Sequence, residues 1–249
     1  MCHAADAYPP RPPVGGAAAS SGDLVLEGGD GNRFAAYFAR AAESTGTGIV
    51  VMPDVRGLHP FYKELAVRFA EAGVDAVAID YFGRTAGIAE RTEDFHYRPH
   101  VEKTTPQDIA ADVAAAVEHL RSAEGGHAQS VFTVGFCFGG ANSWRQSAEG
   151  HRLAGCIGFY GIPDRVKDAV PRMRAPLLIL VAGADFTPLT SFQQFDRELA
   201  AAGVPHQMHV YDGAPHSFFD RAYSEWSEAC DDAWRRVLDF VRSPTGVQA

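Results

Sequence analysis

The sequence predicts an α/β protein whose central sheet is mostly parallel and is covered by helices on both faces. Short apolar and β-branched runs alternate along the chain with longer amphipathic segments. Strands that are separated by helices of this length pair in parallel, and their sheet is buried on both sides. The length of 249 residues fits one large α/β domain.

Each element is supported by a local pattern in the chain. The predicted strands cover residues 33–38, 48–52, 74–79, 130–134, 154–160, 176–181 and 206–211, the first as an edge strand. The predicted helices cover residues 61–72 and 105–122, a segment from about 140, and residues 190–203 and 223–241. Thr105 is the expected N-cap of the second helix, with Pro106 at its first position and Asp108 in its first turn. Thr190 is expected to cap the helix that ends near Gly203.

The first 22 residues are predicted to form a flexible N-terminal arm. They are rich in Pro, Ala, Gly and Ser, and residues 23–249 are then expected to form a single domain. Cys2 and His3 are adjacent, but two ligands cannot complete a tetrahedral metal site, so no metal is expected. The N-terminus has neither a basic start nor an apolar run, which indicates a cytoplasmic protein.

Charge and hydropathy exclude several classes of partner. The formal net charge is −9, and an acidic chain repels the phosphates of nucleic acids. No apolar run approaches the roughly 20 residues that a membrane-spanning helix needs. The four cysteines are too few and too scattered for a disulfide framework, so free thiols are expected.

The most informative stretch runs from Ser130 to Gly140. A predicted strand is followed by Gly-x-Cys-x-Gly-Gly at residues 135–140 and then by a helix. In α/β hydrolases, Gly-x-Ser-x-Gly forms a sharp turn that holds the nucleophile above the sheet. Cys137 takes the place of the serine here, and the helix N-terminus after it would favour the thiolate. The backbone N–H of Phe138 would point at a developing oxyanion. A buried structural cysteine in a glycine-rich turn is the alternative.

Two further residues are expected to act with Cys137. In this fold the chain order is nucleophile, acid, histidine. Asp185 comes just after the strand at 176–181, at the sheet edge where active sites of such folds gather, although it could instead cap a helix. His216 lies in the loop that follows the last predicted strand, and its position distinguishes it from the other nine histidines.

These motifs together resemble the dienelactone hydrolase family. The resemblance extends from about Leu24 to Val241. Its matching pieces are Gly-Phe-Cys-Phe-Gly-Gly at 135–140, Ala-Gly-Ala-Asp at 182–185 with Pro188 after it, Pro-His-Ser-Phe at 215–218, Pro-Asp-Val-Arg-Gly-Leu at 53–58 and Asp-Tyr-Phe-Gly-Arg at 80–84. It implies an α/β-hydrolase fold and a catalytic triad in which Cys137 is the nucleophile, His216 the base and Asp185 the residue that orients His216.

The resemblance also implies several residues around the triad. The backbone N–H of Val55 would be a second oxyanion donor. Family members have a glutamate before this donor that contacts the resting cysteine, and this sequence has the shorter Asp54 there, which could also be a turn residue. Members that act on dienelactones hold the substrate carboxylate with arginines. Arg84 matches one such position and could otherwise be a surface arginine, while Arg221 lies one residue from the other and follows Asp220.

The predicted reaction is hydrolysis of a lactone or ester through a thioester on Cys137, without a metal or organic cofactor. A broad small-ester or thioester hydrolase is a second possibility, and an inactive binding or redox-sensing module is a third. Residues 85–103 are expected either to cover the substrate pocket or to be a surface excursion. The expected partner is a small ester or lactone, and the protein is expected to be a monomer or a small homo-oligomer.

Overall fold

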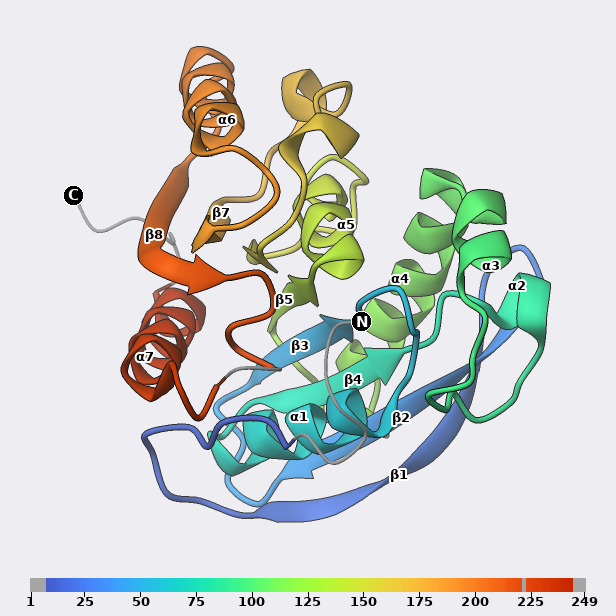
Figure 1. Ribbon diagram of the computed structural model, residues 1–249. Helices are drawn as coiled ribbons and strands as arrows, with labels where there is room; N and C mark the ends of the chain where they lie inside the picture. Colours follow the sequence, from blue (N-terminus) through green and yellow to red (C-terminus); the bar gives the residue numbers. More distant parts are fainter. Residues whose placement is uncertain (1–7, 221–222, 244–249) are drawn as a thin grey trace. The chain divides into compact units, whose positions relative to one another are not determined.

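The computed structural model describes residues 8–220 and 223–243. The chain divides into two compact units. One comprises residues 14–131, and the other joins residues 1–13 to residues 132–249. In Figure 1 the first unit runs from blue to green, and the second runs from green to red and also includes the dark blue residues 8–13.

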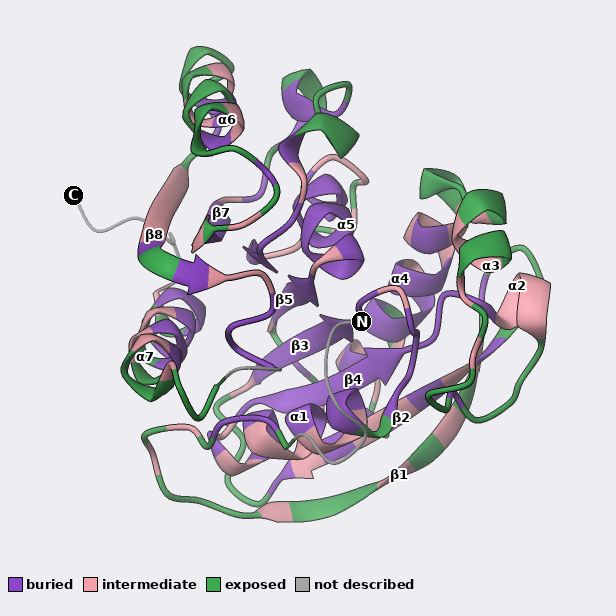
Figure 2. Cartoon of the chain, in the orientation of Figure 1, coloured by how far each residue is buried: buried purple, intermediate pink, exposed green. Residues whose placement is uncertain are grey.

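Four strands form the sheet of the 14–131 unit, in the order β1-β2-β4-β3. Their bounds are β1 Ala18–Glu27, β2 Arg33–Ala41, β3 Thr47–Met52 and β4 Asp75–Ile79. The pairs β1–β2 and β2–β4 are antiparallel, whereas β3 and β4 are parallel. Every residue of β3 and β4 is buried, as Figure 2 shows, which is typical of strands covered on both faces.

Two long helices cover this sheet. Helix α1 spans Pro60–Glu71 and helix α4 spans Pro106–Arg121, and both pack against β4 (Figure 1). The start of α4 is the predicted one, because Thr105 and Asp108 form a reciprocal capping box. Two short helices, α2 Gly83–Ala86 and α3 Arg98–Lys103, lie in and beside the segment 85–103.

The second unit is built on parallel strands in the order β5-β6-β7-β8. Their bounds are β5 Ser130–Phe136, β6 Gly155–Phe159, β7 Leu177–Ala184 and β8 His206–Pro215. The helices are α5 Phe138–Gln146, α6 Leu189–Ala201 and α7 Ser227–Arg242, with the 3-10 turns η1 Pro163–Arg165 and η2 Val170–Arg172 between β6 and β7. The parallel order brings the carboxyl ends of these strands to one edge of the unit, where a site can form.

Helices pack on both faces of this second sheet. Trp144 of α5 and Phe195 of α6 share a buried apolar cluster with Leu177, Ile179 and Val181, which alternate along β7. Helix α7 covers the opposite face. A Cβ added at Gly158 of β6 would strike Trp144 of α5, whereas one added at Gly155 would strike Phe240 of α7. The two glycines therefore let α5 and α7 approach β6 closely from either side.

The N-terminal part of the chain differs from its prediction. Strand β1 begins at Ala18, so residues 18–22 of the predicted arm pair with β2, and β2 is not an edge strand. Pro9 and Pro10 are buried, and the carbonyl of Pro10 accepts a 3.0 Å hydrogen bond from Trp234 Nε1. Cys2 and His3 lie outside the described residues, and the single-domain assignment stays a prediction.

Two smaller findings complete the fold. Helix α6 begins at Leu189 with Pro188 as its N-cap residue, so the predicted cap at Thr190 is wrong. Thr190 lies inside the first turn because Pro188, with its fixed φ of −61°, already ends the extended segment. Within residues 8–220 and 223–243, no helix is long and apolar enough to cross a membrane.

Candidate active site

Cys137 lies at a sharp turn between strand β5 and helix α5. It is the N-cap residue of α5 and has φ 54° and ψ −111°. Non-glycine residues rarely adopt positive φ, and such strain is typical of functional positions. The Cys137 N–H donates to the carbonyl of Phe159 at 3.1 Å, and its carbonyl accepts from Gly140 N–H at 3.0 Å. The turn is therefore tied to β6 on one side and to α5 on the other.

The glycines of the motif make this turn possible. A Cβ at Gly135 would lie 1.9 Å from the carbonyl oxygen of Gly139, and a Cβ at Gly140 would lie 2.4 Å from that of Phe159. Both obstacles are backbone atoms, which cannot move aside cheaply. This geometry therefore requires glycine at positions 135 and 140, the first and last glycines of the motif.

Asp185 and His216 lie next to Cys137 in the same unit. Asp185 directly follows β7, and its side chain is 1% exposed. His216 directly follows β8, and its Nδ1 lies 2.7 Å from Asp185 Oδ2. Because this bond places the Nδ1 proton towards Asp185, Nε2 is left for the other partner. The His216 side chain is also hydrogen-bonded to Cys137.

The electrostatics of His216 fit a histidine between two anions. Burial alone would lower its pKa, but the hydrogen bonds to Asp185 and Cys137 raise that pKa to about 10. This direction is the one expected when an imidazolium faces a carboxylate and a thiolate.

The other described cysteines lie in environments that disfavour the thiolate. Cys156 and Cys230 are buried, and burial raises the pKa of each thiol to about 12. Cys137 is half-buried and faces His216. Of the cysteines that the structure describes, Cys137 therefore has the surroundings that favour a thiolate.

Three residues near this group were not predicted from the sequence. The imidazole of His216 is close to two aromatic rings, with centroid distances of 5.0 Å to Tyr160 and 4.7 Å to Phe186. The guanidinium of Arg165 lies 5.8 Å from the centroid of Phe138, the residue after Cys137. Phe186 could have been suspected because it adjoins Asp185, whereas Tyr160 and Arg165 carry no local signal.

The predicted oxyanion donors come from different places in the chain. Phe138 is the first residue of α5, so its N–H belongs to the helix N-terminus. Val55 and Asp54 follow β3 in the 14–131 unit. Asp54 is fully buried, and its Oδ1 accepts from Arg56 N–H at 2.9 Å in a local turn. Whether Val55 and Asp54 act on Cys137 stays a prediction.

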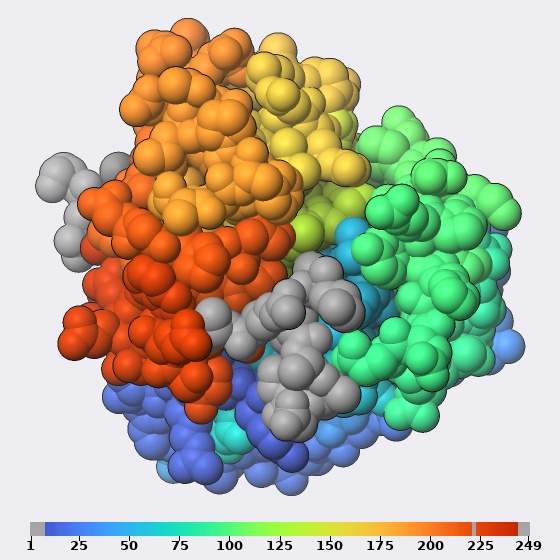
Figure 3. Space-filling view, viewed as in Figure 1, coloured from blue at the N-terminus to red at the C-terminus, as the bar shows by residue number. Residues whose placement is uncertain are grey.

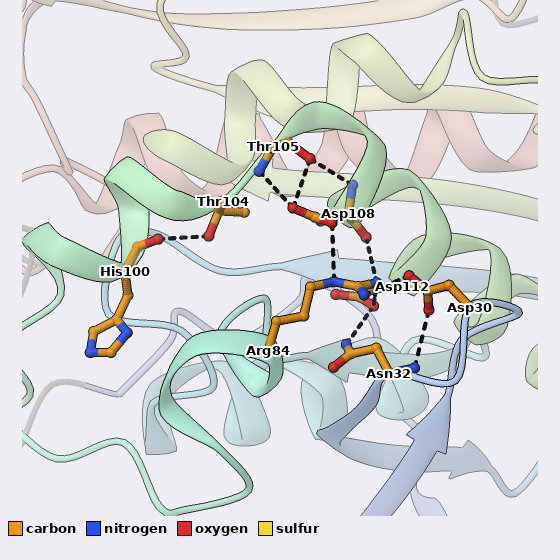
Figure 4. A network of polar contacts seen from close by, with 8 residues as sticks. All are labelled: Asp30, Asn32, Arg84, His100, Thr104, Thr105, Asp108 and Asp112. Atoms are coloured by element: carbon orange, nitrogen blue, oxygen red, sulfur yellow. Dashed lines mark hydrogen bonds and ion pairs between the residues drawn. The ribbon is translucent and has the colours of Figure 1, made fainter.

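Arg84 is surrounded by carboxylates of its own unit. Its guanidinium lies 2.5 Å from Asp30, 3.0 Å from Asp112 and 3.4 Å from Asp108 (Figure 4). Three negative groups already neutralise this arginine, and the side chain is only 20% exposed. These contacts argue against its predicted role in holding a substrate carboxylate. Arg221, the other predicted clamp, lies outside the described residues.

The strand–cysteine–helix turn, with an acid after β7 and a histidine after β8, is the arrangement of an α/β hydrolase. The family model of the dienelactone hydrolase family matches residues 34–244. The chain belongs to the dienelactone hydrolase family. It is therefore an enzyme, a hydrolase of carboxylic ester bonds.

Comparisons with individual proteins agree with this assignment. The chain is 29% identical over 226 residues to a carboxymethylenebutenolidase of Pseudomonas putida, covering 88% of this chain and 94% of that protein. A dienelactone hydrolase-like promiscuous phosphotriesterase from metagenomic libraries has a TM-score of 0.75 and 21% identity, covering 90% of this chain and 98% of that one. An esterase of Pyrococcus furiosus has a TM-score of 0.65 and 13% identity, covering 95% and 97%. The structural matches show the α/β-hydrolase fold.

Proposed function

We propose that the protein hydrolyses a lactone or ester through a thioester on Cys137, as a dienelactone hydrolase-like enzyme. One observation carries this proposal most directly: His216 binds both Asp185 and Cys137, and its pKa is raised to about 10. This is the nucleophile–base–orienter relation of a catalytic triad. The carboxymethylenebutenolidase name of the Pseudomonas putida relative supports a lactone as the substrate.

In the proposed first step, the Cys137 thiolate attacks the substrate carbonyl and a C–S bond forms. The Phe138 N–H stabilises the oxyanion, and the family resemblance implies the Val55 N–H as a second donor. Losing one such donor lowers the rate by about 10²–10³. The C–O bond to the leaving group then breaks, and His216 Nε2 gives its proton to the departing oxygen. In the second step, neutral His216 takes a proton from water, which attacks the thioester and releases the acid and the Cys137 thiolate.

The substrate charge separates two versions of this function. A dienelactone carries a carboxylate, for which Arg84 is the predicted partner. Since Asp30, Asp108 and Asp112 already surround Arg84, a broad hydrolase of small neutral esters or thioesters is the second candidate. A turnover panel with a dienelactone, 4-nitrophenyl acetate and an acyl thioester distinguishes the two by their kcat/KM values.

The nucleophile is tested by the same panel with Cys137→Ala and Cys137→Ser. We expect Cys137→Ala to lose about 10³-fold or more in kcat/KM on every substrate that the wild type hydrolyses. Rapid acid quenching of the wild type should trap an acyl group on Cys137, detected by mass spectrometry of peptides. Cys156→Ala, which changes a cysteine in the buried cluster, is the matched control and should remain active. Full activity of Cys137→Ala would refute the proposed mechanism.

A further inference from the structure

Phe186 is an exposed aromatic residue directly beside the proposed triad. Phe186 is 67% exposed, although the side chain of Asp185 before it is only 1% exposed. Helix α6, which begins at Leu189 just after it, lies at the surface in Figure 3, in orange. The Phe186 ring lies 4.7 Å from the His216 imidazole, at an interplanar angle of 39°. One part of the ring thus contacts His216 while most of it faces solvent.

His216 is held without help from Phe186. Asp185 Oδ2 binds its Nδ1 at 2.7 Å, and the fully buried ring of Tyr160 lies 5.0 Å from its centroid. Asp185 Oδ1 also accepts from Thr187 N–H at 3.4 Å, which fixes the turn that carries Phe186. Because the imidazole already has a hydrogen-bonded edge and a packed aromatic neighbour, an exposed second aromatic ring is not needed to position it.

We propose that Phe186 is a specificity-determining residue that contacts the leaving group of the substrate and favours apolar, aromatic leaving groups. This inference rests on the proposed function. His216 Nε2 must come within about 2.6–3.2 Å of the departing oxygen in order to protonate it. The substituent on that oxygen therefore lies beside the His216 imidazole. The Phe186 ring, whose centroid is 4.7 Å from that of the imidazole, is within reach of this substituent. Aromatic rings associate favourably at such separations.

The position of Phe186 indicates that it acts in the acylation step and not in hydrolysis of the thioester. While the C–S bond forms and the C–O bond breaks, the leaving group lies beside His216 and Phe186. After the leaving group has departed, water occupies this place, and the acyl group is held on Cys137. Phe186 should therefore affect acylation, which kcat/KM reports, and should leave hydrolysis of a given thioester unchanged.

The experiment compares esters that share one acyl group. The substrates are 2-naphthyl acetate, phenyl acetate and methyl acetate, and the variants are Phe186→Ala, Phe186→Tyr and Leu189→Ala. For Phe186→Ala we expect kcat/KM to fall about tenfold on 2-naphthyl acetate, less on phenyl acetate, and less than about twofold on methyl acetate. Phe186→Tyr should restore the wild-type preference because it keeps the ring. Leu189, an exposed apolar residue at the start of α6, is the control and should leave the preference unchanged.

Two further measurements keep the outcomes distinct. The rate of alkylation of Cys137 by iodoacetamide should be the same in Phe186→Ala and in the wild type, as should the rate at which the acetyl-enzyme is hydrolysed. An equal loss on all three acetates, or slower alkylation, would overturn the inference, because Phe186 would then act by holding His216. Failure of the proposed function would look different, since Cys137→Ala would itself remain active.

Discussion

Cys137 and His216 form the smallest unit on which the proposed function depends. The backbone at Cys137 is held at φ 54°, a conformation that costs of order 1–3 kcal/mol for a non-glycine residue. Bonds to Phe159 and Gly140 hold the turn, and they present the thiol to a histidine with a raised pKa. The strain is thus offset by β6 and α5, the elements that flank the turn.

The pH dependence of thiol alkylation tests this pair. The pKa of His216 is raised to about 10, so the proposed pair at neutral pH is an imidazolium beside a Cys137 thiolate. We expect the alkylation rate to change little between about pH 7 and pH 9, whereas a free thiol with a pKa of about 8.5 would react roughly tenfold faster per pH unit below that value. His216→Gln should restore the steep rise. A Cys2→Ser background limits the comparison to Cys137, Cys156 and Cys230.

The outcome is read for each cysteine from labelled peptides. Burial raises the pKa of Cys156 and Cys230, so both should label far more slowly than Cys137. Equal labelling of the three, or a wild-type profile as steep as that of His216→Gln, would contradict a thiolate–imidazolium pair.

The sequence predicted part of this site and missed the rest for a physical reason. Cys137, Asp185 and His216 each follow a recognisable strand, and their order along the chain indicates where they meet. The rings of Tyr160 and Phe186 reach His216 only through packing. The three aspartates around Arg84 come from residues 30, 108 and 112, and no local pattern predicts that such distant residues converge.

At the scale of elements, β1 and the network around Arg84 were the least predictable features. Ala18 to Gly22 lack apolar alternation, so the start of β1 resembled an arm. Pairing with β2 provides hydrogen-bond partners for the backbone of this segment. The strands β3 to β8, together with α4 and its cap, were predicted well because their apolar runs and capping residues are local signals.

Asp112 links these elements, because its buried carboxylate binds both Arg84 and Asn32 (Figure 4). Burial raises the pKa of Asp112 to about 6. The folded protein therefore retains a proton that the unfolded chain loses above about pH 4. Its free energy of unfolding should fall as the pH rises from about 4 to above 6, by about 1–3 kcal/mol from this group.

Asp112→Asn should remove this contribution. Urea unfolding at pH 4.5 and at pH 7.5 measures it, and the variant should gain stability relative to the wild type as the pH rises between the two. Asp30→Asn is the control, since hydrogen bonding to Arg84 lowers the pKa of Asp30 and its removal should not produce that gain. An identical pH dependence in Asp112→Asn and in the wild type would contradict the assignment.

At the scale of the whole molecule, the formal net charge of −9 opposes the approach of anionic substrates. Raising the ionic strength from 10 to 150 mM shortens the screening length from about 30 to about 8 Å. We expect kcat/KM for an anionic dienelactone to rise by about two- to threefold over this range, and kcat/KM for neutral 4-nitrophenyl acetate to stay constant. Stopped assays of product at fixed pH provide both values.

A fall in kcat/KM with added salt would point to a different electrostatic effect. A kcat/KM that falls with added salt for the dienelactone alone would show that a local cation attracts the substrate carboxylate. The Arg84→Ala variant would then be the next comparison, because it should abolish that dependence if Arg84 is the cation.

The contact between Trp234 and Pro10 bears on how the protein can be handled in the laboratory. The indole N–H of Trp234, in α7, donates to the carbonyl of Pro10, which is 224 positions away in the chain. Trimming residues 8–13 would remove the acceptor of this hydrogen bond, next to the packed rings of Trp234 and Phe219. Affinity tags and shortened versions should therefore leave that proline-rich stretch in place, although it looks dispensable in the sequence.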